Sequence, residues 1–180
     1  MERGFKSTAE ALAIELRKEM KLAAHAPLCA FALAKYLEVP LLRFSTLIPL
    51  ALQTNSFNQT MADALEREVH GLTIPWRVGK AVLYNDNRAP ARQQSDISHE
   101  LAHILLGHPL TAMLPGAPTV LRNKELEDEA IHLGGALLMP RTAAIHVLRL
   151  GWSATVAAAH YGISEKLFQW RCNITGAKRR

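Results

Sequence analysis

The chain has 180 residues, 49% of them hydrophobic, which suits one domain with a sizeable core. No stretch reaches the roughly 18 consecutive apolar residues of a transmembrane helix, and the first residues are not followed by the apolar core of a signal peptide. The two cysteines, Cys29 and Cys172, form no CxxC pair, which argues against a structural zinc site built on cysteines. We therefore expect a protein of the reducing cytoplasm that is not bound to a membrane.

The net charge of +5 comes from 21 basic and 16 acidic residues, and part of the excess lies in the tail Lys178-Arg179-Arg180. A tail of this kind is usually solvated, and by itself it does not indicate DNA binding. We expect a single domain over residues 1–176 and a basic tail over residues 177–180.

The first elements in chain order are predicted to be helical. Apolar residues recur at helical spacing over residues 7–24, and Ser7 with Glu10 can form a capping box at the start. Residues 27–37 predict a second helix, and residues 41–47 predict a strand.

The next segment predicts a hairpin. Residues 50–67 are ambiguous, with a helix favoured from Gln59 onward. Residues 72–77 and 80–84 read as two strands joined by a turn, and Pro75 marks the first of them as an edge strand. These elements predict an α+β fold, mainly helical, around a small antiparallel sheet.

The second half of the chain predicts helices separated by one proline- and glycine-rich loop over residues 110–120. One helix opens near Ala89-Pro90 and ends at Gly107. Later helices are predicted over residues 125–139, 141–150, 153–160 and 164–172, the last capped by Ser164.

The most informative motif is His99-Glu100-Leu101-Ala102-His103, an HExxH sequence inside the helix that Gly107 ends. His99 and His103 lie one turn apart on one helix face, where two imidazoles can bind one zinc ion. Glu100 between them is positioned to deprotonate a water on that metal rather than to bind it. The alternative, an amphipathic helix with merely polar histidines, fits this context less well. The motif predicts a zinc hydrolase with a zincin-like metal helix.

A catalytic zinc site usually has a third protein ligand. The metzincin pattern fails, because Leu106 and Pro109 stand where it needs a glycine and a histidine. His108 also fails, since nine residues past His99 an ideal helix points the other way.

A glutamate from the helix after the loop is the remaining route. Glu129 is the first candidate, because the residues at helical spacing after it are apolar, and Glu125, on nearly the same face, is the second. Glu127 and Asp128 are explained by the preference of acids for a first helical turn.

Several segments resemble the ImmA/IrrE family of zinc metallo-endopeptidases. They are Ser98 to His108, Glu129-Ala130 followed by Leu137-Leu138-Met139-Pro140, and Asn85 to Gln93, within a weaker likeness from about Glu10 to Gly176. By this resemblance His99, His103 and Glu129 are zinc ligands and Glu100 is the general base. Such proteins typically cleave a helix-turn-helix repressor and so derepress phage, mobile-element or stress genes.

The chain departs from the family pattern after Glu129-Ala130. Ile131 stands where the family usually has Asn, and Leu133-Gly134-Gly135 stands where it has Phe-Ala-Ala. Two glycines inside a helix cost about 2 kcal/mol relative to alanines. A close approach of this helix to the metal helix would explain them.

The last two helices leave an alternative function open. Glu165, Gln169 and Arg171 would face DNA if the last two helices formed a helix-turn-helix, so a non-proteolytic DNA-binding or protein-interaction regulator is the alternative. We do not expect DNA binding, because Phe168 and Trp170 favour a packed helix.

His132 and Tyr161 are candidate donors to an oxyanion. Because the chain begins directly with the protease-like domain, we expect the repressor to be a separate protein.

Overall fold

The computed structural model describes residues 3–54, 57–77, 79–110 and 123–177. The described elements are, in order, α1 (Phe5–Glu19), α2 (Ala30–Tyr36), β1 (Leu41–Arg43), α3 (Phe44–Ala51), α4 (Gln59–Glu68), β2 (Gly71–Pro75), β3 (Lys80–Tyr84), α5 (Pro90–Leu105), α6 (Lys124–Leu138), α7 (Arg141–Arg149), α8 (Ala154–Tyr161) and α9 (Glu165–Ile174). The predicted α+β class, mainly helical, is confirmed. The predicted loop and the basic tail lie outside the described residues, except for Leu110 and Ala177.

The sheet is mixed, where a wholly antiparallel one was expected. Its strand order is β1-β3-β2, with β2 antiparallel and β1 parallel to β3. The predicted strand over residues 41–47 ends at Arg43, and the chain continues as α3. Because α3, α4 and β2 lie between β1 and β3 in the chain, the connection is long enough for β1 and β3 to pair in parallel. β2 is at one edge of the sheet, as Pro75 predicted.

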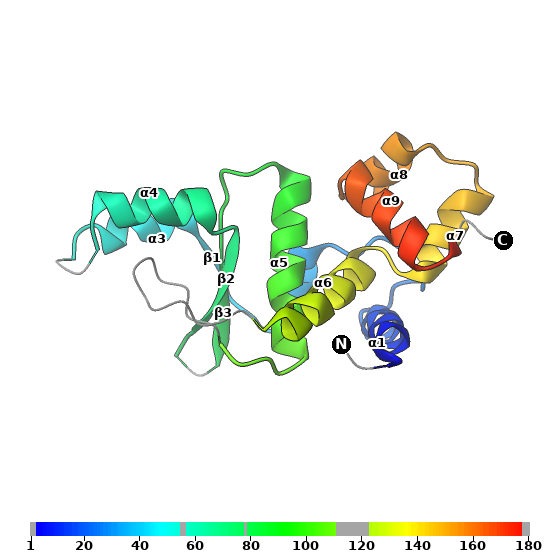
Figure 1. The fold of residues 1–180 in the computed structure, drawn as a ribbon, viewed down its shortest axis with the longest axis horizontal. Coiled ribbons are helices and arrows are strands. Elements are labelled where there is room, and N and C mark those ends of the chain that lie inside the picture. The colour runs from blue at the N-terminus through cyan, green and yellow to red at the C-terminus, as the bar shows by residue number, and fades with distance from the viewer. Residues whose placement is uncertain (1–2, 55–56, 78, 111–122, 178–180) are drawn as a thin grey trace.

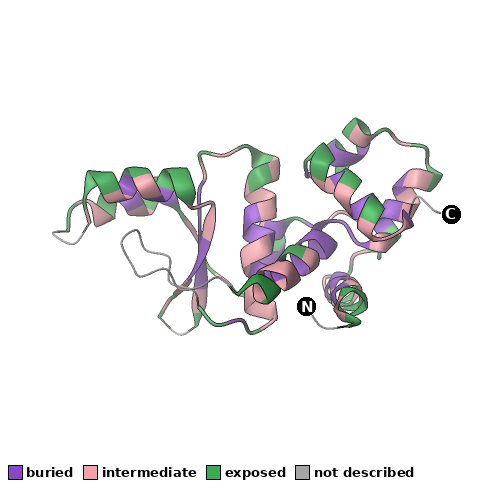
Figure 2. Cartoon of the chain, in the orientation of Figure 1, coloured by how far each residue is buried: buried purple, intermediate pink, exposed green. Residues whose placement is uncertain are grey.

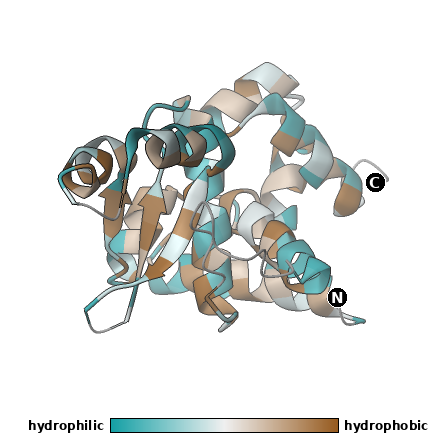
Figure 3. Ribbon diagram, turned by 60° about the vertical axis from the view of Figure 1, so that its left-hand side comes forward, coloured by the Kyte–Doolittle hydropathy of each residue, from teal (hydrophilic) through white to brown (hydrophobic). Residues whose placement is uncertain are grey.

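The sheet lies between two helical layers. Val82 and Tyr84 of β3 belong to the main core, whereas Leu83 joins a smaller cluster with Phe44 and Ile48 of α3. This alternation follows from the two-residue period of strand side chains. Helices α3 and α4 therefore cover one face of the sheet and α5 packs on the other (Figures 1 and 3).

Helix α5 begins and ends where the sequence predicted. Pro90 occupies its first turn, and Gly107, with a left-handed φ of 68°, ends it. The N–H of Gly107 donates to the carbonyl of Ile104 at 3.1 Å, and the N–H of His108 donates to that of His103 at 3.0 Å. These two bonds form a Schellman motif, which folds His108 back over the last turn of α5.

Helix α6 is held at its carboxyl end by two buried arginines. Arg17 of α1 donates to the carbonyl of Leu137 at 2.7 Å, and Arg171 of α9 donates to that of Met139 at 2.7 Å. Glu10 pairs with Arg171 and does not form the predicted capping box, because α1 begins at Phe5. Helices from both ends of the chain thus fix α6 beside α5, and the carboxyl-terminal half of α6 is largely buried (Figure 2).

No single helix among the residues that the structure describes is long and apolar enough to cross a membrane. Helices α6 and α7 together reach the required length and composition, but they are bent by 45° where they meet.

Candidate metal centre

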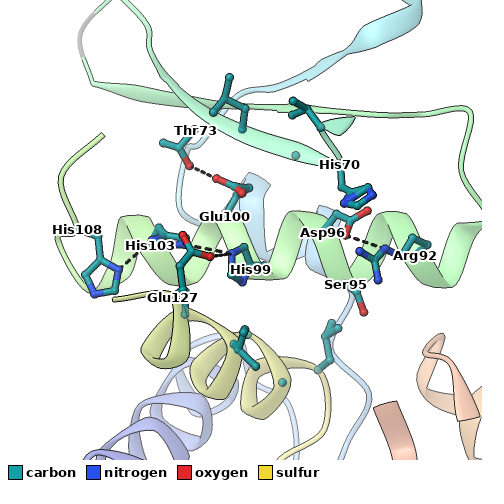
Figure 4. Close-up of a pocket in the computed structure, with 18 of the residues that line it drawn as sticks. His70, Thr73, Arg92, Ser95, Asp96, His99, Glu100, His103, His108 and Glu127 are labelled. Carbon is teal, nitrogen blue, oxygen red and sulfur yellow. Dashed lines mark hydrogen bonds and ion pairs between the residues drawn. The ribbon is translucent and has the colours of Figure 1, made fainter. Parts of the chain in front are cut away.

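Three side chains from α5 and α6 converge on one point. The Nε2 atoms of His99 and His103 are 3.1 Å apart. The carboxylate of Glu127 lies 3.4 Å from Nε2 of His99 through one oxygen and 3.6 Å from Nε2 of His103 through the other (Figure 4). Among the residues that the structure describes, these three form the group able to hold a metal ion, with ligand atoms all within 4.8 Å of one another.

The third member of this group is Glu127, where the sequence argument and the family resemblance pointed to Glu129. The structure does not bring Glu129 into the group; its carboxylate lies 3.4 Å from Nε2 of His108. Glu125, the second candidate, is exposed and is not in the group either.

Helix geometry explains why Glu127 occupies this position. Gly134 of α6 lies against the backbone of α5 at His99. At 100° per residue, Glu127 is about 20° from Gly134 around the helix axis, whereas Glu129 is about 140° away. The apolar residues that follow Glu129 did not reveal this face, because the second half of α6 is buried on every side.

Glu100 lies next to the metal-binding group but outside it, as the motif predicted. Its carboxylate accepts a hydrogen bond of 2.7 Å from the hydroxyl of Thr73 on β2. A Cβ atom at Gly71 would lie 3.1 Å from Cγ of Glu100, so this glycine leaves room for the side chain. Burial raises the pKa of Glu100, while the electrostatic interaction with His99 and the hydrogen bond from Thr73 act in the opposite direction.

The centre opens into a pocket of about 500 Å³ between β2, α5 and α6. Besides the ligands, polar side chains line it: His70, Thr73, Lys80, Arg92, Ser95, Asp96 and His108. Arg92 pairs with Asp96 at 3.0 Å, and burial raises the pKa of Asp96. Neither His70 nor Thr73 could be assigned to the site from the sequence, because the hairpin residues that face α5 are determined by how the sheet packs on that helix.

The other sequence candidates lie away from this pocket. His132 contacts the ring of Trp170 and borders a separate, smaller cavity, and the hydroxyl of Tyr161 donates to the carbonyl of His25. Arg171, which a recognition helix would present to DNA, is 2% exposed and bonded to Met139 and Glu10.

Comparison with known families agrees with this geometry. A family model described as the IrrE N-terminal-like domain, peptidase family M78, matches residues 48–173. The chain belongs to this family. The ImmA/IrrE metallopeptidase resemblance is thereby confirmed, and the range matched in this IrrE-like chain includes α5, α6 and all three residues of the metal-binding group. No curated protein and no solved structure matches the chain.

Proposed function

We propose that this IrrE-like protein is a zinc-dependent endopeptidase. The observation that carries the proposal is the spacing of the ligand atoms. Zinc–nitrogen bonds of 2.0–2.1 Å in a tetrahedron place ligand atoms about 3.3–3.4 Å apart, and the separations here are 3.1, 3.4 and 3.6 Å. Two imidazoles and one carboxylate are a ligand set of zinc peptidases and leave a fourth position for water or substrate. The residues of the centre therefore fit zinc.

Glu100 supplies the acid–base chemistry of the proposed reaction. Zinc bound at the centre would polarise the scissile carbonyl and lower the pKa of water. Glu100 accepts a proton from the attacking water at its carboxylate and later delivers it to the leaving amine. The hydrogen bond from Thr73 holds that carboxylate in the lining of the pocket.

The pocket suits an extended segment of polypeptide. The edge strand β2 forms one wall, and the main-chain groups of an edge strand can pair with a peptide laid beside them. A volume of about 500 Å³ accommodates a few residues rather than a folded domain. We expect cleavage within an exposed linker or loop of the substrate.

We propose, on the family resemblance, that the substrate is a separate helix-turn-helix repressor in the cytoplasm and that its cleavage derepresses mobile-element or stress genes. A recognition helix formed by α9 would need the charge of Arg171 at its surface to contact DNA. Because Arg171 is buried, its position supports this proposal over DNA binding by α8 and α9.

The proposal is tested by incubating the zinc-loaded protein with the product of a neighbouring repressor gene and mapping fragments by mass spectrometry. We expect one main cut with the wild-type protein and none with Glu100→Gln. Rapid digestion of unrelated unfolded proteins such as casein would argue against a dedicated regulator. Failure to cut any co-encoded repressor would contradict the substrate assignment.

A further inference from the structure

His108 bridges the metal centre and the carboxylate of Glu129. Its Nδ1 atom is 2.9 Å from Nδ1 of His103, and its Nε2 atom is 3.4 Å from an oxygen of Glu129. The His108 side chain is only 5% exposed. A buried imidazole in contact with two polar groups has its proton positions fixed by them.

The direction of these contacts follows from His103. Its Nε2 atom lies in the metal-binding group and must offer its lone pair to a bound metal ion, so in the metal-loaded protein the proton of His103 sits on Nδ1. His103 therefore donates to Nδ1 of His108. The proton of His108 then lies on Nε2, which faces the carboxylate of Glu129.

The backbone holds His108 in this place. The left-handed turn at Gly107 brings it back to His103, with its N–H bonded to the His103 carbonyl. The ammonium group of Lys80, at the start of β3, donates to the carbonyl of His108 at 3.1 Å. The ring is thus positioned by both the helix end and the sheet.

We propose that Glu129 and His108 are positioning residues that act on the metal through His103. The carboxylate polarises His108, which accepts the proton of His103, fixes its tautomer and increases the basicity of its Nε2 atom. This inference rests on the proposed metal function. It gives Glu127 and Glu129 of α6 different roles, with Glu127 in the metal-binding group and Glu129 behind one of its histidines.

Zinc affinity, measured by competition with a chelator, provides the first test. His108→Leu and Glu129→Gln should each bind zinc about 10–100-fold more weakly than the wild-type protein. The double variant should bind no more weakly than His108→Leu, because the carboxylate acts only through the ring. Asp128→Asn, a matched change of the neighbouring acid, should leave affinity unchanged.

Two further measurements separate this role from a merely structural one. His108→Gln should recover much of the lost affinity, because a carboxamide can accept from His103 and donate to Glu129. Nitrogen-15 NMR of the zinc-loaded protein should show His103 protonated on Nδ1 and His108 on Nε2, with a slowly exchanging His103 proton that His108→Leu abolishes.

Three results would overturn the proposed action of Glu129 through His108 on His103. They are a zinc affinity within twofold of wild type in both His108→Leu and Glu129→Gln, an additive loss in the double variant, or a His108 proton on Nδ1. If His108→Leu fails to fold, Glu129→Gln and the wild-type NMR spectrum still decide the question. A wild-type protein that binds no zinc would overturn the proposed function itself, which is a distinguishable outcome.

Discussion

Gly134 of α6 lies against the backbone of His99. A Cβ atom added at Gly134 would be 3.2 Å from Cα of His99 and 3.2 Å from the carbonyl oxygen of Ser98. The hydroxyl of Ser98 also donates to the carbonyl of Gly134 at 2.9 Å. The glycine therefore sets how closely the helix that carries Glu127 approaches the helix that carries both histidines.

Gly134→Ala should separate the two helices at the metal centre. Alanine would gain about 1 kcal/mol of helix propensity, but overpacking against rigid backbone costs roughly 1–3 kcal/mol. We expect a lower melting temperature of the metal-free protein and weaker zinc binding, measured by thermal denaturation and chelator competition.

Gly135→Ala is the matched control for this change. A Cβ atom there would lie 2.6 Å from the ring of Trp170, on the side of α6 that faces α9. It should lower the melting temperature while leaving zinc affinity near the wild-type value. Equal losses of zinc affinity in the two variants would show that general destabilisation, not helix spacing, is responsible.

Thr73→Val should slow peptide cleavage without releasing the metal. The change keeps the shape of the side chain but removes the hydroxyl that donates to Glu100. Hydrogen bonds to charged groups contribute about 1.5–3 kcal/mol, so a loss of roughly tenfold or more in kcat is expected. Thr73→Ser should restore most of the rate. Wild-type kcat in Thr73→Val would exclude a role for this hydroxyl.

Glu100→Gln should keep bound zinc and lose peptidase activity. Glutamine preserves the size of the side chain, and Glu100 lies outside the metal-binding group, but a carboxamide cannot accept the proton of the attacking water. Metal analysis after dialysis and a cleavage assay measure the two properties. Cleavage at the wild-type rate would remove Glu100 from the mechanism.

Glu127→Ala should lose most of the bound zinc, because two histidines alone remain in the metal-binding group. Glu125→Ala, which changes an exposed acid two residues earlier on α6, should lose none. Retention of zinc by Glu127→Ala, together with its complete loss in Glu129→Ala, would restore Glu129 as the third ligand.

The sequence predicted those parts of the fold that depend on local signals. Three of these signals act within a few residues: Pro90 starts α5 through its restricted φ, Gly107 ends it through a left-handed φ, and the Ser164 hydroxyl accepts from the N–H of Leu167 to cap α9. The HExxH motif is also local, since one helical turn relates His99 to His103.

The third side chain of the metal-binding group depends instead on how two helices pack. Apolar periodicity could not orient α6, because nearly all of its second half is buried. The useful signal was Gly134: a glycine kept at a cost in helix propensity marks the face of close approach, and Glu127 lies on that face two turns earlier.

His108 was excluded as a third ligand on the geometry of an ideal helix, and the structure places it outside the metal-binding group but in contact with His103. An ideal helix would carry His108 away from His99, but the left-handed Gly107 reverses the chain and returns the ring to His103. The helix stop predicted at Gly107 could have indicated this position of His108, since a Schellman motif bonds the second residue beyond the helix to the last helical turn.

The most direct test of the account is the position of zinc in a crystal of the wild-type protein, located by anomalous scattering at the zinc edge. The account predicts one strong peak bonded to Nε2 of His99, Nε2 of His103 and the carboxylate of Glu127, with Glu129 turned toward His108. A peak coordinated by Glu129, or the absence of any peak between the two histidines in zinc-loaded crystals, would contradict it.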